Sequence, residues 1–302
     1  MTFATGARHG LSYIAEESFG VTPASPDMTQ LRHTACSLGL TKTTLESDEI
    51  RSDRQISDIL HGQKTVSGDI SFELSYGAFD DMFAGLMQSD WSSDVLKAGS
   101  SQPSFTFERS FGDISQYQAL SGCVIDSLRL SVKPDRMVTG KFSILGKASS
   151  FAASALDASP TAAVANDPMD SFSGSLTEGG SAIAIVAGLE LVVDNGLEQA
   201  FVLGDAEAAT ILAGRSRVSG EIITYFEDAA LLNKFVNRTA SSLGITFSGA
   251  GGTITLSLPS IVYTGAENPV AGATGPITLS LPFTAIYDPD EQTNLKITRT
   301  AA

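Results

Sequence analysis

The stretch that decides the fold runs from Val66 to Tyr76 and reads Val-Ser-Gly-Asp-Ile-Ser-Phe-Glu-Leu-Ser-Tyr. Its apolar members are Val66, Ile70, Phe72, Leu74 and Tyr76, and the alternating polar members are Ser67, Asp69, Ser71, Glu73 and Ser75. Successive side chains of a strand point to opposite faces of its sheet. This period of two therefore predicts a strand with one face in the core and one in water.

A short helix is predicted directly after this strand, between Gly77 and Met87. The apolar residues of this segment recur three and four positions apart: Phe79, Met82, Phe83, Leu86 and Met87. Residues at that spacing share one side of a helix, so the stripe predicts a helix that packs on the sheet.

The same order of elements returns 152 residues later. Residues 45–70 align with residues 197–222 without a gap and share ten identities. The identical pairs are Leu45/Leu197, Glu46/Glu198, Asp53/Asp205, Ile59/Ile211, Leu60/Leu212, Gly62/Gly214, Val66/Val218, Ser67/Ser219, Gly68/Gly220 and Ile70/Ile222. Val218–Thr224 then repeats the strand and Asp228–Arg238 the helix. The repeat predicts an internal duplication; the alternative is a chance match between two amphipathic patterns.

Further strands are predicted in both copies. Segments rich in Val, Ile, Leu and Phe lie at residues 104–108, 124–132, 138–145, 245–247, 253–262 and 277–287. Residues 148–180 are instead dense in Ala, Ser, Asp, Pro and Gly, which is typical of a connector or of an ordered irregular loop. The sequence thus predicts a mainly β protein of two domains, residues 1–160 and 161–302, each with one short flanking helix.

Composition narrows the class of protein. Hydrophobic residues make up 42% of the 302 residues, which argues against disorder. With 19 basic and 34 acidic residues, the net charge of −15 has the wrong sign for binding nucleic acid through its phosphates. No secretory signal or apolar run of about 20 residues is found, so the sequence predicts a soluble protein. Cys36 and Cys123 lack the spacing of a zinc site or a disulfide framework, which fits a reducing compartment.

Residue types that catalyse reactions or bind metals are sparse. His9, His33 and His61 are too few and too widely spaced to suggest a metal site. The segment Asp288-Pro-Asp-Glu291 has three carboxylates, but it lacks the spacing and glycine of a calcium loop and is typical of a turn. The sequence therefore predicts no enzyme, no catalytic residue, no metal and no cofactor.

An acidic stretch with scattered apolar residues runs from Thr44 to Asp58. Such a stretch is commonly a solvated loop. The alternative is a contact arm, whose isoleucines bury apolar surface against a neighbouring subunit while its two arginines pair with that subunit's carboxylates. The residues of this candidate arm are Glu46, Asp48, Glu49, Ile50, Arg51, Asp53, Arg54 and Ile56.

Several motifs together resemble a known family. They are Glu46–Gln55, Gly62, Val66–Ile70, the helix around Phe79, the later Gly265-Ala-x-Asn-Pro segment, and Ile277–Tyr287 closing on Asp288-Pro289. In these motifs the sequence is similar to the tail tube (major tail) proteins of long-tailed, siphovirus-like bacteriophages. The likeness covers most of the chain outside the connector and marks a structural family rather than a chemistry.

The resemblance implies a β-sandwich or split barrel in each domain, and subunits that form stacked rings around a channel for the genome. The polar side of the quoted strand would line this lumen, where acidic residues keep the DNA backbone from adhering. The implied lumen-lining residues are Ser67, Asp69, Ser71, Glu73, Ser219 and Glu221. Rings in the family are commonly sixfold, so two tube domains per chain imply three chains per ring, unless the second domain decorates the outside.

The resemblance also implies partners and location. The chain would bind other copies of itself and the tape-measure, terminator and distal tail proteins. Double-stranded DNA would pass without adhering, and no membrane would be involved. Assembly would take place in the host bacterial cytoplasm, and the product would reside in the virion tail.

Two other interpretations stay open. A tube of a contractile tail or of a secretion apparatus would share the fold and would engage a sheath. A cell-surface-binding β-sandwich adhesin would carry clustered aromatic residues, and the single tryptophan, Trp91, with six tyrosines gives it little support.

Overall fold

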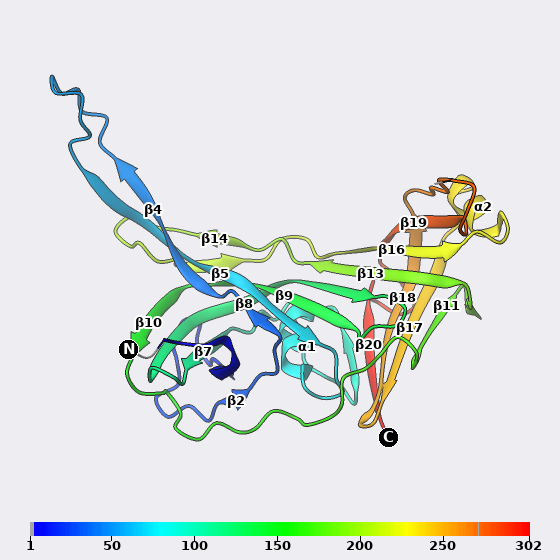
Figure 1. Ribbon diagram of the computed structural model, residues 1–302, viewed down its shortest axis with the longest axis horizontal. Helices are drawn as coiled ribbons and strands as arrows, with labels where there is room; N and C mark the ends of the chain where they lie inside the picture. Colours follow the sequence, from blue (N-terminus) through cyan, green and yellow to red (C-terminus); the bar gives the residue numbers. More distant parts are fainter. Residues whose placement is uncertain (1–2, 271) are drawn as a thin grey trace.

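The secondary structure is that of a mainly β protein. A computed structural model describes residues 3–270 and 272–302, with 51% of the chain in strands and 6% in helices. The predicted fold class, strands in large antiparallel sheets with two short helices, is confirmed (Figure 1). The sheets do not close into a barrel within these described ranges.

We call the elements up to β10 the first half and the remainder the second half. The first half contains a 3₁₀ turn (Gly6–Arg8), β1 (His9–Ala15), β2 (Thr29–Gln30), β3 (Ala35–Cys36), β4 (Gly39–Glu46), β5 (Ile59–Glu73), α1 (Asp80–Met87), β6 (Val95–Lys97), β7 (Phe105–Phe111), β8 (Gln116–Val132), β9 (Thr139–Gly146) and β10 (Ala148–Ala152). The second half contains β11 (Gly174–Glu178), β12 (Ser181–Ala182), β13 (Val186–Asp194), β14 (Glu198–Ala200), β15 (Thr210–Leu212), β16 (Arg217–Tyr225), α2 (Ala230–Val236), β17 (Ser241–Gly249), β18 (Gly252–Tyr263), β19 (Thr278–Ala285) and β20 (Lys296–Ala301).

Both halves follow the same plan of antiparallel strand pairing. In the first half the order is β4–β5–β9–β8–β7–β1, with β10 added to β8. In the second half it is β13–β16–β19–β18–β17–β11, with β20 added to β18. Each helix follows the strand in second place, β5 or β16. A repeated topology thus accompanies the repeated sequence.

One sheet joins the halves. Strand β13 pairs with β16 on one side and with β8 of the first half on the other, from Leu189 opposite Val132 to Asp194 opposite Ser127. The order β4–β5–β9–β8–β13–β16–β19 therefore runs unbroken through both halves. A second ladder between β6 and β20 also connects them.

Strand β8 is long enough to take part in two sheets. Its first part pairs with β7 and β10, and its last part pairs with β9 and β13. The register of the ladder to β9 shifts between Ile125 and Ser127, close to where β8 passes from its first partners to its second. The sequence pattern predicts only residues 124–132, because Gln116–Cys123 contains no Val or Ile.

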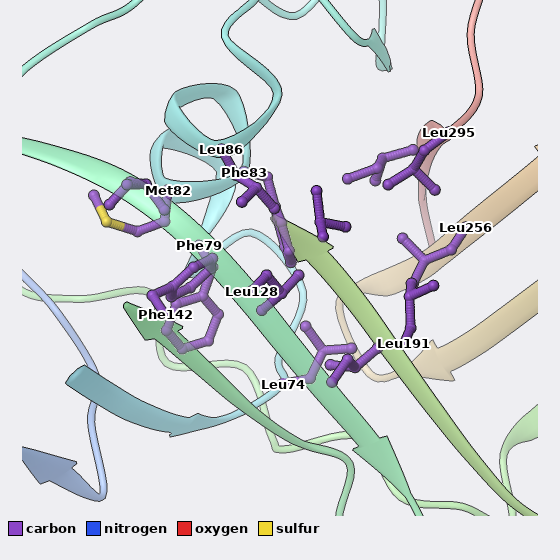
Figure 2. Packing of buried hydrophobic residues seen from close by; sticks show 14 of the residues in the cluster. Leu74, Phe79, Met82, Phe83, Leu86, Leu128, Phe142, Leu191, Leu256 and Leu295 are labelled. Atoms are coloured by element: carbon purple, nitrogen blue, oxygen red, sulfur yellow. The ribbon is translucent and has the colours of Figure 1, made fainter. Parts of the chain in front are cut away.

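The buried core is continuous across the halves. Phe83 of α1 meets Phe142 of β9 edge to face, with ring centres 5.9 Å apart. Leu128 of β8 lies beside them, and Leu191 and Leu256 extend the same cluster into the second half (Figure 2). The two copies of the repeat are therefore packed together as well as covalently linked.

The two helices differ in how deeply they are buried. In α1 the predicted stripe is in the core, and Phe83 is 3% exposed. Helix α2, predicted over Asp228–Arg238, spans Ala230–Val236 and has no buried residue. Its Val236 is 68% exposed. The second helix is thus the less covered of the pair.

The predicted connector is only partly irregular. Residues 148–180 contain β10, β11 and an irregular segment between them, residues 153–173, so the two strands correct the prediction. This segment is anchored on the first half, because Met169 N donates to Leu74 O (2.7 Å) and the Met169 side chain is buried. The predicted boundary at residue 160 falls within it. Backbone pairing, which the composition of the segment does not reveal, orders this part of the chain.

Candidate functional site

One side of the joined sheet carries the polar residues that the sequence singles out. On β5, the core side holds Val66, Ile70 and Phe72, each at most 1% exposed. The opposite side holds Ser67, Asp69, Ser71 and Glu73, all partly exposed. The predicted alternation is confirmed from Val66 to Glu73, where β5 ends, but Ser75, predicted on the water side, is 1% exposed and accepts a hydrogen bond from Arg32.

The corresponding residues of the second half lie on the same side. Directly opposed residues of antiparallel strands project to one side of a sheet. One row of opposed residues runs Glu73, Thr139, Ser131, Glu190, Glu221, a second runs Ser71, Lys141, Arg129, Val192, Ser219, and a third runs Asp69, Ser143, Ser127, Asp194, Arg217. We call this surface, which crosses β5, β9, β8, β13 and β16, the polar face.

Asp69 is held in place by its neighbours on β9. Its carboxylate accepts hydrogen bonds from Ser143 Oγ (2.7 Å) and Lys141 Nζ (2.9 Å). Burial alone would raise the pKa of Asp69, but these hydrogen bonds and the Lys141 charge outweigh burial and lower it. Asp69 thus keeps its negative charge, partly neutralised by a partner.

The rest of the polar face mixes acids with bases. Arg129 pairs with Glu190 across the joint between the halves, and Ser280 Oγ donates to Glu221. In the three rows, among described residues, the acids are Asp69, Glu73, Glu190, Asp194 and Glu221, and the bases are Arg129, Lys141 and Arg217. Alternation along the predicted strands 124–132 and 138–145 could have identified the two bases on β8 and β9. The face is acidic in balance but is not uniformly acidic.

The candidate arm is a projecting hairpin. We call residues 43–64 the first arm; they comprise the ends of β4 and β5 and the loop between them, and they extend away from the body (Figure 1). Every predicted arm residue is exposed. Ile50 is 98% and Ile56 is 60% exposed. Within the chain these isoleucines bury little surface.

The two arginines of the first arm differ in their contacts. Arg51 makes a two-pronged pair with Asp53 of its own loop, with distances of 3.0 and 2.7 Å. Arg54 sits in a turn with φ 62°, and its N–H donates to Arg51 O (3.3 Å). Arg51 therefore already has a carboxylate partner inside the arm.

The matching segment of the second half is docked, which the sequence does not predict. We call residues 195–216, which contain β14 and β15, the second arm. Lys64 N donates to Ala206 O (2.7 Å), and Lys64 Nζ lies 3.2 Å from Glu207. Ile211 of this arm is 3% exposed, whereas Ile59 at the matching position of the first arm is 51% exposed. The two arms thus share sequence but differ in their surroundings.

The structure brings two of the histidines together. His9 Nδ1 lies 2.9 Å from His33 Nε2, and Arg109 Nε is 3.2 Å from His9 Nε2. Burial, followed by the charges of Arg109 and His33, lowers the pKa of His9 to about 4. No group of three or more His, Cys, Asp or Glu residues with metal-binding geometry occurs among the residues described.

Two other sequence interpretations can be compared with the structure. Asp288 Oδ1 accepts from Asp290 N (3.0 Å) and Glu291 N (2.9 Å), so this acidic segment is the predicted turn. Within residues 3–270 and 272–302, no helix is long and apolar enough to cross a bilayer.

The sequence was compared with family models and with curated proteins. A family model with the description "Phage tail tube protein" matches residues 6–285. The search of curated proteins found no match. The family match spans the polar face and both arms.

Proposed function

Because the chain belongs to the phage tail tube protein family, we propose that it polymerises into stacked rings that form the tube of a siphovirus-like tail. The family match confirms the resemblance to phage tail tube proteins and identifies a structural protein of the virion tail. The family is generally non-enzymatic. The proposed tube is a channel through which the genome passes during ejection.

One observation carries the proposal: the joined sheet has a polar face that runs through both halves, and β4 at its edge pairs only with β5 among described strands. The unpaired edge of a strand is a template for another strand. A closed ring of such sheets has no free edges. Polymerisation would therefore satisfy the strand edges that the single chain leaves open.

The polar face is proposed to line the lumen. Its acids repel the phosphate backbone of DNA, and its few bases prevent the face from becoming strongly self-repelling. Repulsion extends only about 8 Å at physiological salt, so it acts on DNA inside the tube. Residues from both halves would contribute, including Glu73 and Glu221.

The repeated topology supports two tube domains per chain, residues 1–160 and 161–302, and hence three chains per ring. The first arm is proposed to contact a neighbouring subunit through the apolar residues that it exposes.

Tape-measure, terminator and distal tail proteins are the further partners proposed. Assembly is proposed to take place in the host cytoplasm, with no membrane involved.

Electron microscopy tests the tube. Purified chain is expected to form hollow fibres in negative stain, and a reconstruction is expected to contain three chains per layer. Globular monomers under all conditions would contradict the proposal, and six chains per layer would refute the three-chain ring.

A charge reversal tests the lumen. Tubes of the double variant Glu73→Lys and Glu221→Lys, assembled with duplex DNA, are expected to retain it through sedimentation, because four units of charge change inside the channel. The matched control, Asp90→Lys with Glu227→Lys, changes exposed residues off the polar face by the same charge. Equal DNA retention by the two variants would disprove the assignment of the lumen.

A further inference from the structure

The joint between the halves shows how the edge strand and arm of one half bind to the other half. Asp194 of β13 lies opposite Ser127 of β8. Just beyond it, Asn195 N donates to Asp126 O (2.9 Å), and the buried Asn195 Nδ2 donates to Leu86 O of α1 (2.8 Å). The second arm then continues across the first half. Edge strand β13 and the start of the second arm thus contact strand β8 and helix α1.

The first half has a matching edge and arm, with which the second arm forms hydrogen bonds or ion pairs, among the described residues, only at Lys64 at the base of the first arm. Thr65 and Arg217 are matching positions of the repeat, 152 residues apart. Thr65 lies opposite Thr41, and Arg217 lies opposite Asp194. Thr41 therefore matches Asp194. Thr41 is exposed, and the outer side of β4 has no paired strand within the described ranges.

The second half has the complementary surface. Thr264 N donates to Pro282 O (2.8 Å), and Glu267 exchanges hydrogen bonds of 3.0 and 2.8 Å with Ser280, so Thr264–Glu267 continues β18 along β19. Among the described residues, no strand pairs with the outer side of this segment, which corresponds to the side of β8 that receives β13. Helix α2, which contacts β18, has no buried residue. This surface and the first arm lie at opposite ends of the molecule (Figure 1).

The register of the two surfaces follows from the strand ladders. Asp69 and Glu221 match at the 152-residue offset, and they lie opposite Ser143 and Pro282 respectively. Ser143 is in turn opposite Ser127, and Pro282 receives the bond from Thr264. Thr264 therefore matches Ser127, the residue that faces Asp194 within the chain.

We propose that β3, β4 and the first arm of one chain dock on Thr264–Glu267 and α2 of a second copy, with Thr41 opposite Thr264. The inference rests on the proposed tube, and it adds which surfaces meet and in which register. The exposed Arg238 beyond α2 offers a partner for the acids of the first arm, but the exposed Glu227, Asp228 and Glu267 of the same surface are acidic, so the matched strand register and not charge defines the contact. Since the two surfaces differ, the contact is head to tail and can close into a ring.

Disulfide trapping tests the register. In a Cys36→Ser background that keeps the buried Cys123, chains with Thr41→Cys and Thr264→Cys are assembled into tubes and oxidised. Asn195 N bonds to Asp126 O, so Asp194 and Ser127 form a non-hydrogen-bonded pair. Such pairs have Cα atoms about 4.5 Å apart, within disulfide range. Non-reducing electrophoresis is expected to give dimers and trimers, about tenfold above the control.

The matched control is Thr41→Cys with Thr253→Cys, because Thr253 of β18 already has Ser248 and Thr300 on its two sides. Mixing chains that carry only one cysteine each should give dimers that neither single variant gives alone. Tubes without cross-links above the control would overturn the inference while leaving the tube intact. Absence of tubes from the unmodified chain would instead overturn the proposed function. A ladder beyond three chains would support the contact and overturn the three-chain ring.

Discussion

The first and second arms have related sequences and opposite surroundings. Ile211 of the second arm is 3% exposed, and its carbonyl accepts from Gln102 of the first half (3.2 Å), whereas Ile59, its match, is 51% exposed in the projecting hairpin. The helices show the reverse, because α1 is buried and α2 is not. Helix α1 packs mainly on β8 and β6 of its own half, and the second arm adds the hydrogen bond from Asn195 to Leu86 O, a contact that α2 and the first arm would make only between two chains.

Matched substitutions in the two helices give the largest expected contrast. Phe83→Ala is expected to lower the free energy of unfolding of the unassembled chain by about 3–5 kcal/mol, because a buried ring is removed from the core. Phe235→Ala, at the matching half-buried position, is expected to cost only about 1 kcal/mol. Urea unfolding followed by circular dichroism measures both. Equal losses would mean that α2 is as well covered as α1.

A second contrast compares the arms. Ile211→Ala is expected to cost about 2–5 kcal/mol in the unassembled chain, because a buried side chain leaves a cavity. Ile59→Ala should change that stability by no more than about 0.5 kcal/mol, as for other surface substitutions. Only tube assembly should suffer in the Ile59 variant, which sedimentation measures. A large stability loss from Ile59→Ala would show that the first arm is already docked in the free chain.

Local periodicity accounts for the parts of the fold that the sequence predicts. The alternation from Val66 to Glu73 and the apolar spacing after Phe79 depend on neighbours a few residues away, so both elements are confirmed. The 152-residue repeat likewise matches the repeated pairing plan. Strands β10 and β11 lack such periodicity and depend on pairing with distant strands, so composition alone assigns them to a connector.

The candidate site is predictable only where it depends on one strand. Alternation places Asp69 and Glu73 on the polar side of β5. Their partners are set by register: Lys141 reaches Asp69 from another strand, and Arg129 meets Glu190 only because β8 joins β13. The docking of the second arm is likewise a tertiary contact, which the shared sequence of the two arms does not distinguish.

A smaller effect is expected from the ion pair that fixes the second arm. Lys64 and Glu207 are 3.2 Å apart, with side chains 35% and 29% exposed, so Glu207→Gln should cost less than about 1 kcal/mol. The first arm has Gln55 at the matching position, so the substitution makes the two arms more alike. A double-mutant cycle with Lys64→Met measures the coupling. Coupling above that range would assign the pair a larger part in docking the arm.

The smallest expected effect lies on the polar face, at the matched positions Ser143 and Pro282. Proline has no side-chain donor, so Ser143→Ala removes from Asp69 a hydrogen bond that position 282 cannot give to Glu221, whose hydroxyl donor is Ser280. The pKa of Asp69 is expected to rise towards its ordinary value, because one of the hydrogen bonds that lower it is lost.

The sign of the stability change follows from that lowered pKa. A depressed folded-state pKa contributes stability above the unfolded value near 3.8 and loses it as the pH falls through the folded value. Ser143→Ala should therefore reduce stability at pH 6 by less than about 1 kcal/mol, since the pair is partly solvated, and have less effect at pH 2. Carbon-13 NMR titration of the carboxyl group measures the pKa, with Ser127→Ala as the control. An unchanged pKa would show that the Ser143 hydroxyl contributes nothing to the lowered pKa of Asp69 and that Lys141 alone sets it.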